Sequence, residues 1–129
     1  MIALDRPDVH PSILVVDDDE DIRSSVAEIL RGQGYAVREA GDGDEALDLV
    51  GSQRFAAIVL DVRMPKVSGT AVLDALADPP PVVLMSAHAL EADVRCRVQD
   101  KVRSYLRKPF SPRVLIDELA GIVGAGGEP

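Results

Sequence analysis

Residues 13–19 read ILVVDDD, an apolar run that passes directly into an acidic one. Its first four residues, Ile13 to Val16, are apolar without a break. Such a run is typical of a strand buried on both faces, as in the middle of a parallel sheet. Three carboxylates follow at once, Asp17, Asp18 and Asp19. The stretch therefore predicts a central strand whose carboxyl end opens onto an acidic site.

The same strand pattern recurs along the chain, and helical patterns separate its copies. Apolar β-branched runs occur at residues 56–60 and 82–85, with weaker ones at 35–39 and 104–106. Apolar residues at helical spacing predict helices around residues 22–30, 46–50, 72–76, 90–98 and 111–123. The expected helix ends are Gly32-Gln33-Gly34, Gly51 and Pro79-Pro80-Pro81, and Ser111-Pro112 is expected to open the last helix. This (βα)5 order predicts an α/β fold, a doubly wound parallel five-stranded sheet with helices on both faces.

Length and composition limit the class of protein. A chain of 129 residues with one cysteine, Cys96, predicts one domain without an internal disulfide or a Cys-based zinc site. We expect a flexible extension at residues 1–11, the domain at 12–123 and a tail at 124–129. No apolar run approaches the roughly 20 residues of a membrane span, and the N-terminus lacks the features of a signal peptide. We therefore expect a cytoplasmic protein without membrane contact.

The charge is negative overall and unevenly distributed. The net charge of −8 disfavours direct binding of nucleic acid. Eleven of the 22 acidic residues lie between Asp17 and Asp48, and six of the 14 basic residues lie between Arg95 and Lys108. The basic residues before Lys108 form either a solvated face or a docking surface for an acidic partner, and both readings stay open: Arg95, Arg97, Lys101, Arg103 and Arg107.

Polar side chains follow the predicted strands at one edge of the sheet. Asp17 and Asp18 follow the first strand, Asp61 the third, Ser86 the fourth and Lys108 the fifth. Ligands bind at this edge in open parallel sheets. Carboxylates there suit Mg²⁺, and a hydroxyl and an ammonium suit a phosphoryl group. An aspartate can act as the nucleophile toward phosphorus.

Part of the acidic run has a structural alternative. Asp19, Glu20 and Asp21 can serve as an N-cap and as acids that complement the helix dipole. A carboxylate at the end of a continuous apolar strand is costly to bury unpaired, so Asp61 is better explained by function.

These segments, taken in order, resemble the receiver domain of response regulators, the CheY-like family of two-component signalling. The resemblance covers about residues 12–123 and includes Val59-Leu-Asp-Val-Arg-Met-Pro with Gly69, Leu84-Met-Ser-Ala-His and Tyr105-Leu-Arg-Lys-Pro-Phe. It implies strand order 2-1-3-4-5, a cis bond before Pro109, and transfer of a phosphoryl group from a histidine kinase or phosphotransfer protein to Asp61. It also implies Mg²⁺ or Mn²⁺ held by Asp18, Asp61 and the main-chain carbonyl of Arg63, with Asp17 acting through water.

The resemblance further implies a switch. Ser86 and Lys108 would move onto the phosphoryl group, and Tyr105 would turn inward. The surface of the fourth helix, fifth strand and fifth helix would then repack to control an output protein, an output domain or a dimer. Arg63 and His88 either tune the lifetime of the phosphoryl group or are simply solvated, and both readings stay open. Phosphotransfer and slow autodephosphorylation would be self-catalysed, so the chain is not expected to be an enzyme. Lys101 and Val102 replace a pair that is often Gly-Ala in the family. The family pattern therefore does not predict the end of the fourth helix or the shape of the loop before the fifth strand.

Two alternatives compete with this interpretation. The chain can be a degenerate receiver that acts as an interaction module without phosphorylation. It can also be a small phosphatase with an aspartate nucleophile, because Asp17 and Asp19 have the spacing of haloacid-dehalogenase-like enzymes. The separate Asp61 and the Lys108-Pro109 segment favour the receiver.

Overall fold

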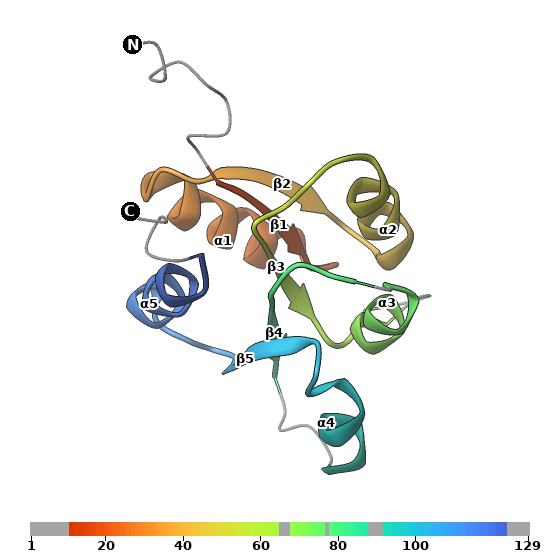
Figure 1. Ribbon diagram of the computed structural model, residues 1–129. Coiled ribbons are helices and arrows are strands. Elements are labelled where there is room, and N and C mark those ends of the chain that lie inside the picture. Colours follow the sequence, from red (N-terminus) through yellow and green to blue (C-terminus); the bar gives the residue numbers. More distant parts are fainter. Residues whose placement is uncertain (1–10, 65–67, 77, 88–91, 124–129) are drawn as a thin grey trace.

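The computed structural model describes residues 11–64, 68–76, 78–87 and 92–123. Five parallel strands form one sheet in the order β2-β1-β3-β4-β5, as expected (Figure 1). The strands are β1 (Ser12–Val16), β2 (Ala36–Ala40), β3 (Ala57–Asp61), β4 (Val82–Ser86) and β5 (Val102–Arg107). The helices are α1 (Glu20–Gly32), α2 (Gly43–Ser52), α3 (Gly69–Ala75), α4 (Ala92–Val98) and α5 (Pro112–Val123).

The continuous apolar strands are buried because helices cover both faces of the sheet. Side chains alternate between faces along a strand. Ile13 and Val15 therefore join the core beneath α1 and α5, while Leu14 and Val16 join the core shared with α2, α3 and α4. All four are 0% exposed. This explains why the first strand has no polar alternation.

Local sequence fixes the starts of two helices as predicted. The Asp19 carboxylate accepts hydrogen bonds from the N–H groups of Asp21 and Ile22, which makes Asp19 the N-cap of α1. The structural reading of the Asp19–Asp21 stretch is thus confirmed. At α5, Ser111 Oγ accepts from the N–H of Val114, and Pro112 occupies the first helical position.

Two helix ends differ from the sequence prediction. α2 does not close at Gly51 but continues to Ser52, since the N–H of Gln53 still donates to the carbonyl of Leu49. α3 ends at Ala75, well before the prolines, with Leu76 as its C-cap. Glycine weakens a helix interior only modestly, so Gly51 need not end α2, and a proline limits how far a helix can continue without fixing where it ends.

Lys101 accounts for the unusual segment before β5. Its ammonium donates to the carbonyl oxygens of Leu73 at 2.7 Å and Leu76 at 2.8 Å. These carbonyls lie at the C-terminus of α3, whose last turn contains no basic residue. A cation there satisfies open acceptors and complements the helix dipole. Lys101 therefore joins the α4–β5 turn to α3.

The expected N-terminal extension, except Pro11, and the expected C-terminal tail lie outside the described residues. In the part of the chain that the structure describes, no helix is long and apolar enough to cross a membrane.

Candidate functional site

Three carboxylates converge at the carboxyl edge of the sheet. β1 and β3 pair with Val16 opposite Leu60, which places the following residues, Asp17 and Asp61, next to each other. Asp18 stands beside them in the β1–α1 loop, and one oxygen from each of the three lies within 4.8 Å of the others. Asp17 is 0% exposed and Asp61 is 5% exposed, whereas Asp18 is open to solvent. The expected acidic site is therefore assembled from β1 and β3.

Lys108 reaches this cluster from beyond β5. Its Nζ lies 2.9 Å from Asp17 Oδ2 and 3.1 Å from Asp61 Oδ1. The main-chain N–H of Lys108 donates to the carbonyl of Ser86 at 2.8 Å, which ties the lysine segment to the end of β4. The Lys108-Pro109 peptide bond is cis, as the resemblance implied.

Burial and charge oppose each other at the site. Burial raises the pKa of Asp61, the hydrogen bond from Lys108 lowers it, and the neighbouring charges of Asp17 and Asp18 raise it further; the pKa is raised on balance. Burial alone would lower the pKa of Lys108, but its two carboxylate partners outweigh burial and raise it. Lys108 is thus held as a cation.

The loops around the cluster are fixed by main-chain contacts. The N–H of Asp19 donates to Asp17 Oδ1 at 3.0 Å. Gly69, at the start of α3, packs on the end of β3: a Cβ there would overlap the carbonyl oxygen of Asp61 and lie 3.0 Å from Val62 Cα. Only glycine fits this close approach.

The other predicted site residues that the structure describes lie on β4, on β5 and just after β3. Ser86 is the last residue of β4, the strand that pairs with β3, and is partly exposed. Arg63 is exposed two residues beyond Asp61, and His88 lies outside the described residues. Tyr105 lies within β5, opposite Leu84, with its ring packed against the core.

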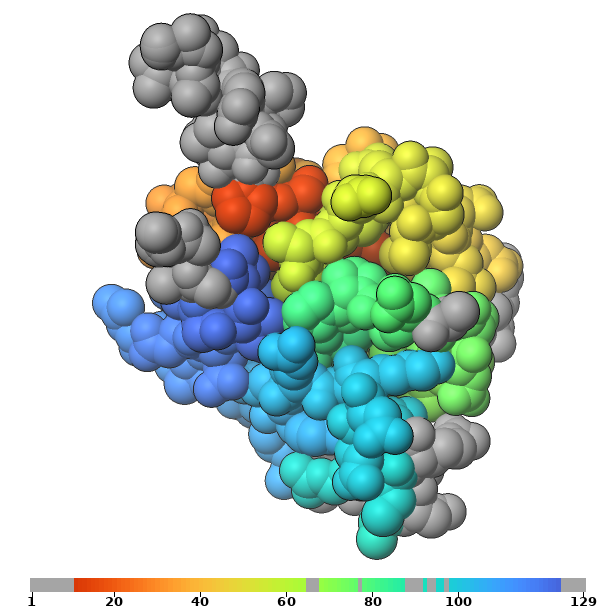
Figure 2. All heavy atoms as spheres, in the orientation of Figure 1, coloured from red at the N-terminus to blue at the C-terminus, as the bar shows by residue number. Residues whose placement is uncertain are grey.

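Tyr105 contacts Arg95, one of the basic residues for which the sequence allowed either a solvated face or a docking surface. The guanidinium carbon of Arg95 lies 4.5 Å from the centroid of the Tyr105 ring, a cation–π contact between α4 and β5. The Tyr105 hydroxyl is buried and has no hydrogen-bond partner among the described residues. In Figure 2 the α4, β5 and α5 surfaces adjoin on one side of the molecule, coloured from cyan to blue.

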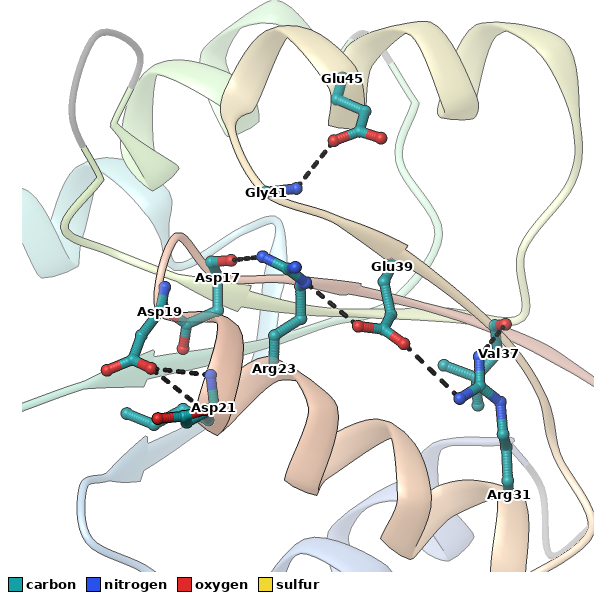
Figure 3. A network of polar contacts seen from close by, with 10 residues as sticks. Asp17, Asp19, Asp21, Arg23, Arg31, Val37, Glu39, Gly41 and Glu45 are labelled. Atoms are coloured by element: carbon teal, nitrogen blue, oxygen red, sulfur yellow. Dashed lines mark hydrogen bonds and ion pairs between the residues drawn. The ribbon is translucent and has the colours of Figure 1, made fainter.

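Arg23 is a site neighbour that the sequence analysis did not single out. From the first turns of α1, its Nη1 donates to the main-chain carbonyl of Asp17 at 2.9 Å, and its Nε donates to Glu39 at 3.1 Å (Figure 3). A basic residue on an amphipathic helix gives no signal of such a contact, because the acceptor is a main-chain oxygen.

The donor set suits a divalent cation. Three carboxylates and one ammonium leave a formal charge of −2, and every candidate ligand is an oxygen. Mg²⁺ prefers oxygen ligands and takes few carboxylates while keeping several waters. The fold and the site therefore define an open parallel α/β domain with a hard-cation site at the carboxyl edge of its sheet.

Comparisons with known proteins identify the family. The family model for the response regulator receiver domain matches residues 13–120. The chain therefore belongs to the response-regulator receiver family, and the recognition from sequence is confirmed.

Relatives of known name agree with this assignment. The chain is 37% identical over 114 residues to the response regulator MprA of Mycolicibacterium vanbaalenii, covering 86% of this chain and 49% of the relative. It is 36% identical to MprA of Mycobacterium avium, covering 86% of this chain and 50% of the relative. The chain thus spans about half the length of these curated relatives.

Solved structures share the fold. The chemotaxis protein CheY4 of Vibrio cholerae matches with a TM-score of 0.81 and 28% identity, covering 88% of this chain and 98% of that one. A CheY-like receiver from Methanospirillum hungatei matches with a TM-score of 0.84 and 25% identity, over 91% and 96% of the two chains. The receiver of the sensor histidine kinase PA1611 from Pseudomonas aeruginosa, described with magnesium coordinated in its active site cleft, matches at 0.80 with 28% identity, over 89% and 98%.

Proposed function

We propose that this chain is a phosphoacceptor, in which Asp61 takes a phosphoryl group from the phosphohistidine of a histidine kinase or phosphotransfer protein. One observation carries the proposal. Lys108 Nζ lies 2.9 Å from Asp17 and 3.1 Å from Asp61, at the point where three carboxylates converge. Phosphoryl transfer depends mainly on positioning and charge neutralisation, and this arrangement offers both.

In the proposed step, a carboxylate oxygen of Asp61 attacks the phosphorus. The P–N bond of the donor breaks, and the donor imidazole takes a proton from water as it leaves. The product is an acyl phosphate on Asp61. Lys108 contributes one positive charge toward the phosphoryl oxygens.

The same residues offer oxygen ligands for a metal ion. The carboxylates of Asp18 and Asp61 and the main-chain carbonyl of Arg63 would hold Mg²⁺ or Mn²⁺, with Asp17 contributing through water. When bound, the ion supplies further neutralisation of phosphoryl charge. The magnesium in the similar receiver of PA1611 supports this assignment.

The phosphoryl group would act as a switch. It adds about 1.5–2 negative charges and strong acceptor oxygens. Ser86 and Lys108 would move onto these oxygens, Tyr105 would turn further inward, and the α4–β5–α5 surface would repack for an output partner, an output domain or a dimer. The hydrogen bond from the Lys108 N–H to the Ser86 carbonyl supports this assignment, because it holds the two residues side by side. Arg63 and His88 would tune the lifetime of the acyl phosphate.

An apolar hollow beside the site fits the donor protein. Lys108 contacts Asp61 and also lines the hollow, so the hollow adjoins the site. A partner that presents a histidine to Asp61 would therefore cover the hollow. The other walls come from α1 and from the segments after β4 and β5: Asp21, Ile22, Ser25, Val26, Ile29, Ala87, Pro109 and Phe110. Ile29→Arg should slow transfer from a protein donor while leaving transfer from acetyl phosphate unchanged. Equal slowing of both reactions would contradict this assignment.

The proposed function is tested with acetyl phosphate, Mg²⁺ and intact-mass analysis, with Asp61→Asn in parallel. We expect an adduct of one phosphoryl group that requires Mg²⁺ and is absent from the variant. Absence of the adduct from the wild-type chain would favour the interaction module without phosphorylation. Steady turnover of a generic phosphate ester would favour the phosphatase instead.

A further inference from the structure

We propose that Arg23 is a positioning residue for the cation-binding loop, holding the peptide between Asp17 and Asp18 in the orientation that metal binding needs. The inference rests on the proposed metal site. It concerns a residue of α1 that presents no side-chain oxygen to the ion and touches the loop only through the main chain.

The first observation is how Asp17 is held. Its N–H donates to the carbonyl of Ala40 at 3.1 Å, and its carboxylate accepts from the N–H of Asp19 and from Lys108. Its carbonyl accepts from Arg23 Nη1 at 2.9 Å. This carbonyl belongs to the same peptide plane as the N–H of Asp18. Fixing it therefore fixes the direction in which the chain enters Asp18, one of the three carboxylates.

The second observation is that Arg23 is itself clamped. Its Nε lies 3.1 Å from Glu39 Oε1, and the other oxygen of Glu39 lies 3.5 Å from Arg31 Nη1 (Figure 3). Arg31 also donates to the carbonyl of Val37 at 3.0 Å. The side chains of Arg23 and Glu39 are only 18% and 28% exposed. A planar guanidinium presents its donors as a rigid fork, so it fixes the angle between two acceptors more firmly than the rotatable donors of an ammonium do.

A close glycine leaves room for this guanidinium. A Cβ at Gly41 would lie 3.2 Å from Arg23 Nη1. The chain of contacts thus runs from the end of β1 through α1 to β2 and the start of the β2–α2 loop. The sheet and the helix together set the position of the Arg23 head group.

Electrostatics and positioning predict opposite results when Arg23 is replaced. Arg23 is a cation near an acidic site. If only its charge mattered, its removal should tighten the binding of another cation. If Arg23 acts by holding the peptide, its removal should weaken binding, because residues that orient metal ligands typically contribute about tenfold or more to affinity. The sign of the change separates the two accounts.

The test is the dissociation constant of Mn²⁺, measured by water proton relaxation at constant ionic strength, in the wild-type chain and two variants. Arg23→Gln removes the bond to the Asp17 carbonyl. Arg31→Gln is the matched control, since it also loses an ion pair with Glu39 but does not contact Asp17. We expect affinity about tenfold weaker for Arg23→Gln and a much smaller loss for Arg31→Gln, because Arg31 reaches Arg23 only through Glu39.

Three results would overturn the inference: unchanged or tighter binding in Arg23→Gln, equal weakening in both variants, or no Mn²⁺ binding by the wild-type chain. Thermal unfolding of each variant accompanies the titration. If Arg23→Gln does not fold, Arg23→Lys replaces it. That change keeps the charge, so electrostatics predicts unchanged binding, but it removes the fork of donors that joins Glu39 to the Asp17 carbonyl, so positioning predicts weaker binding. Mn²⁺ binding is measured without a phosphodonor. A chain that binds Mn²⁺ but is never phosphorylated would refute the proposed function and leave the role of Arg23 intact.

Discussion

Replacing Lys108 by methionine should destabilise the metal-free protein by about 3 kcal/mol, a typical cost of breaking a buried ion pair by removing one partner. At distances of 2.9 and 3.1 Å, each ion pair contributes about 5 kcal/mol of direct attraction at an effective dielectric constant of about 20. Desolvation of the three charges offsets much of this attraction. The loss, which typically ranges over about 3–5 kcal/mol, falls at the lower end here, because Lys108 keeps 17% of its side chain exposed and Asp61 can take up a proton.

The assay is urea unfolding at pH 7 with EDTA and again with Mg²⁺. Without metal, Lys108→Met should lower the free energy of unfolding by about 3 kcal/mol and the melting temperature by about 10–15 °C. Saturating Mg²⁺ should restore part of the loss, since a cation then compensates the same carboxylates. Adding Asp61→Asn to Lys108→Met should also restore part of it, because one buried charge is gone. A loss well below 1 kcal/mol, or no recovery in the double variant, would refute the reasoning.

Three further predictions follow from the same contacts. Burial raises the pKa of Asp61 above its ordinary value of 3.8, so the ionised carboxylate destabilises the metal-free fold once the pH exceeds that value. Asp61→Asn should therefore be more stable than the wild type at pH 7 in thermal unfolding with EDTA, and the difference should shrink near pH 4. Gly69→Ala should destabilise the protein by about 1–3 kcal/mol in urea and weaken Mn²⁺ binding, since its Cβ overlaps the Asp61 carbonyl; unchanged stability would contradict the close packing. Lys101→Met should cost about 1–3 kcal/mol, since it removes two charge-assisted bonds at the end of α3, and hydrogen exchange should speed up first in that helix.

The sheet was predictable because its signal is local. Continuous apolar runs such as Ile13–Val16 are required when helices cover both faces, so buried strands can be identified without knowledge of their neighbours. The acidic cluster was predictable for the same reason. Parallel strands end at one edge, where Asp17 follows β1, Asp61 ends β3 and Lys108 follows β5.

The contacts that join distant segments were not predictable. Arg23 and Lys101 both donate to main-chain carbonyls, and any residue can offer such an acceptor. Arg95 covers the ring of Tyr105, but the sequence showed only a basic residue on a helix. The end of α2 was missed by one residue, because glycine weakens a helix only modestly and the N–H of Gln53 still donates to the carbonyl of Leu49.

The central claim is that Asp61 carries the phosphoryl group, and chemical trapping tests it most directly. The chain would be treated with acetyl phosphate and Mg²⁺, reduced with borohydride, which converts an acyl phosphate of aspartate to homoserine, and digested with trypsin. The peptide between Arg54 and Arg63 contains Asp61 as its only acidic residue. The account predicts homoserine at position 61 in this peptide, only in samples that contained both acetyl phosphate and Mg²⁺. Homoserine at Asp17 or Asp18 instead, or an unmodified peptide in a sample that carries the phosphoryl adduct, would contradict it.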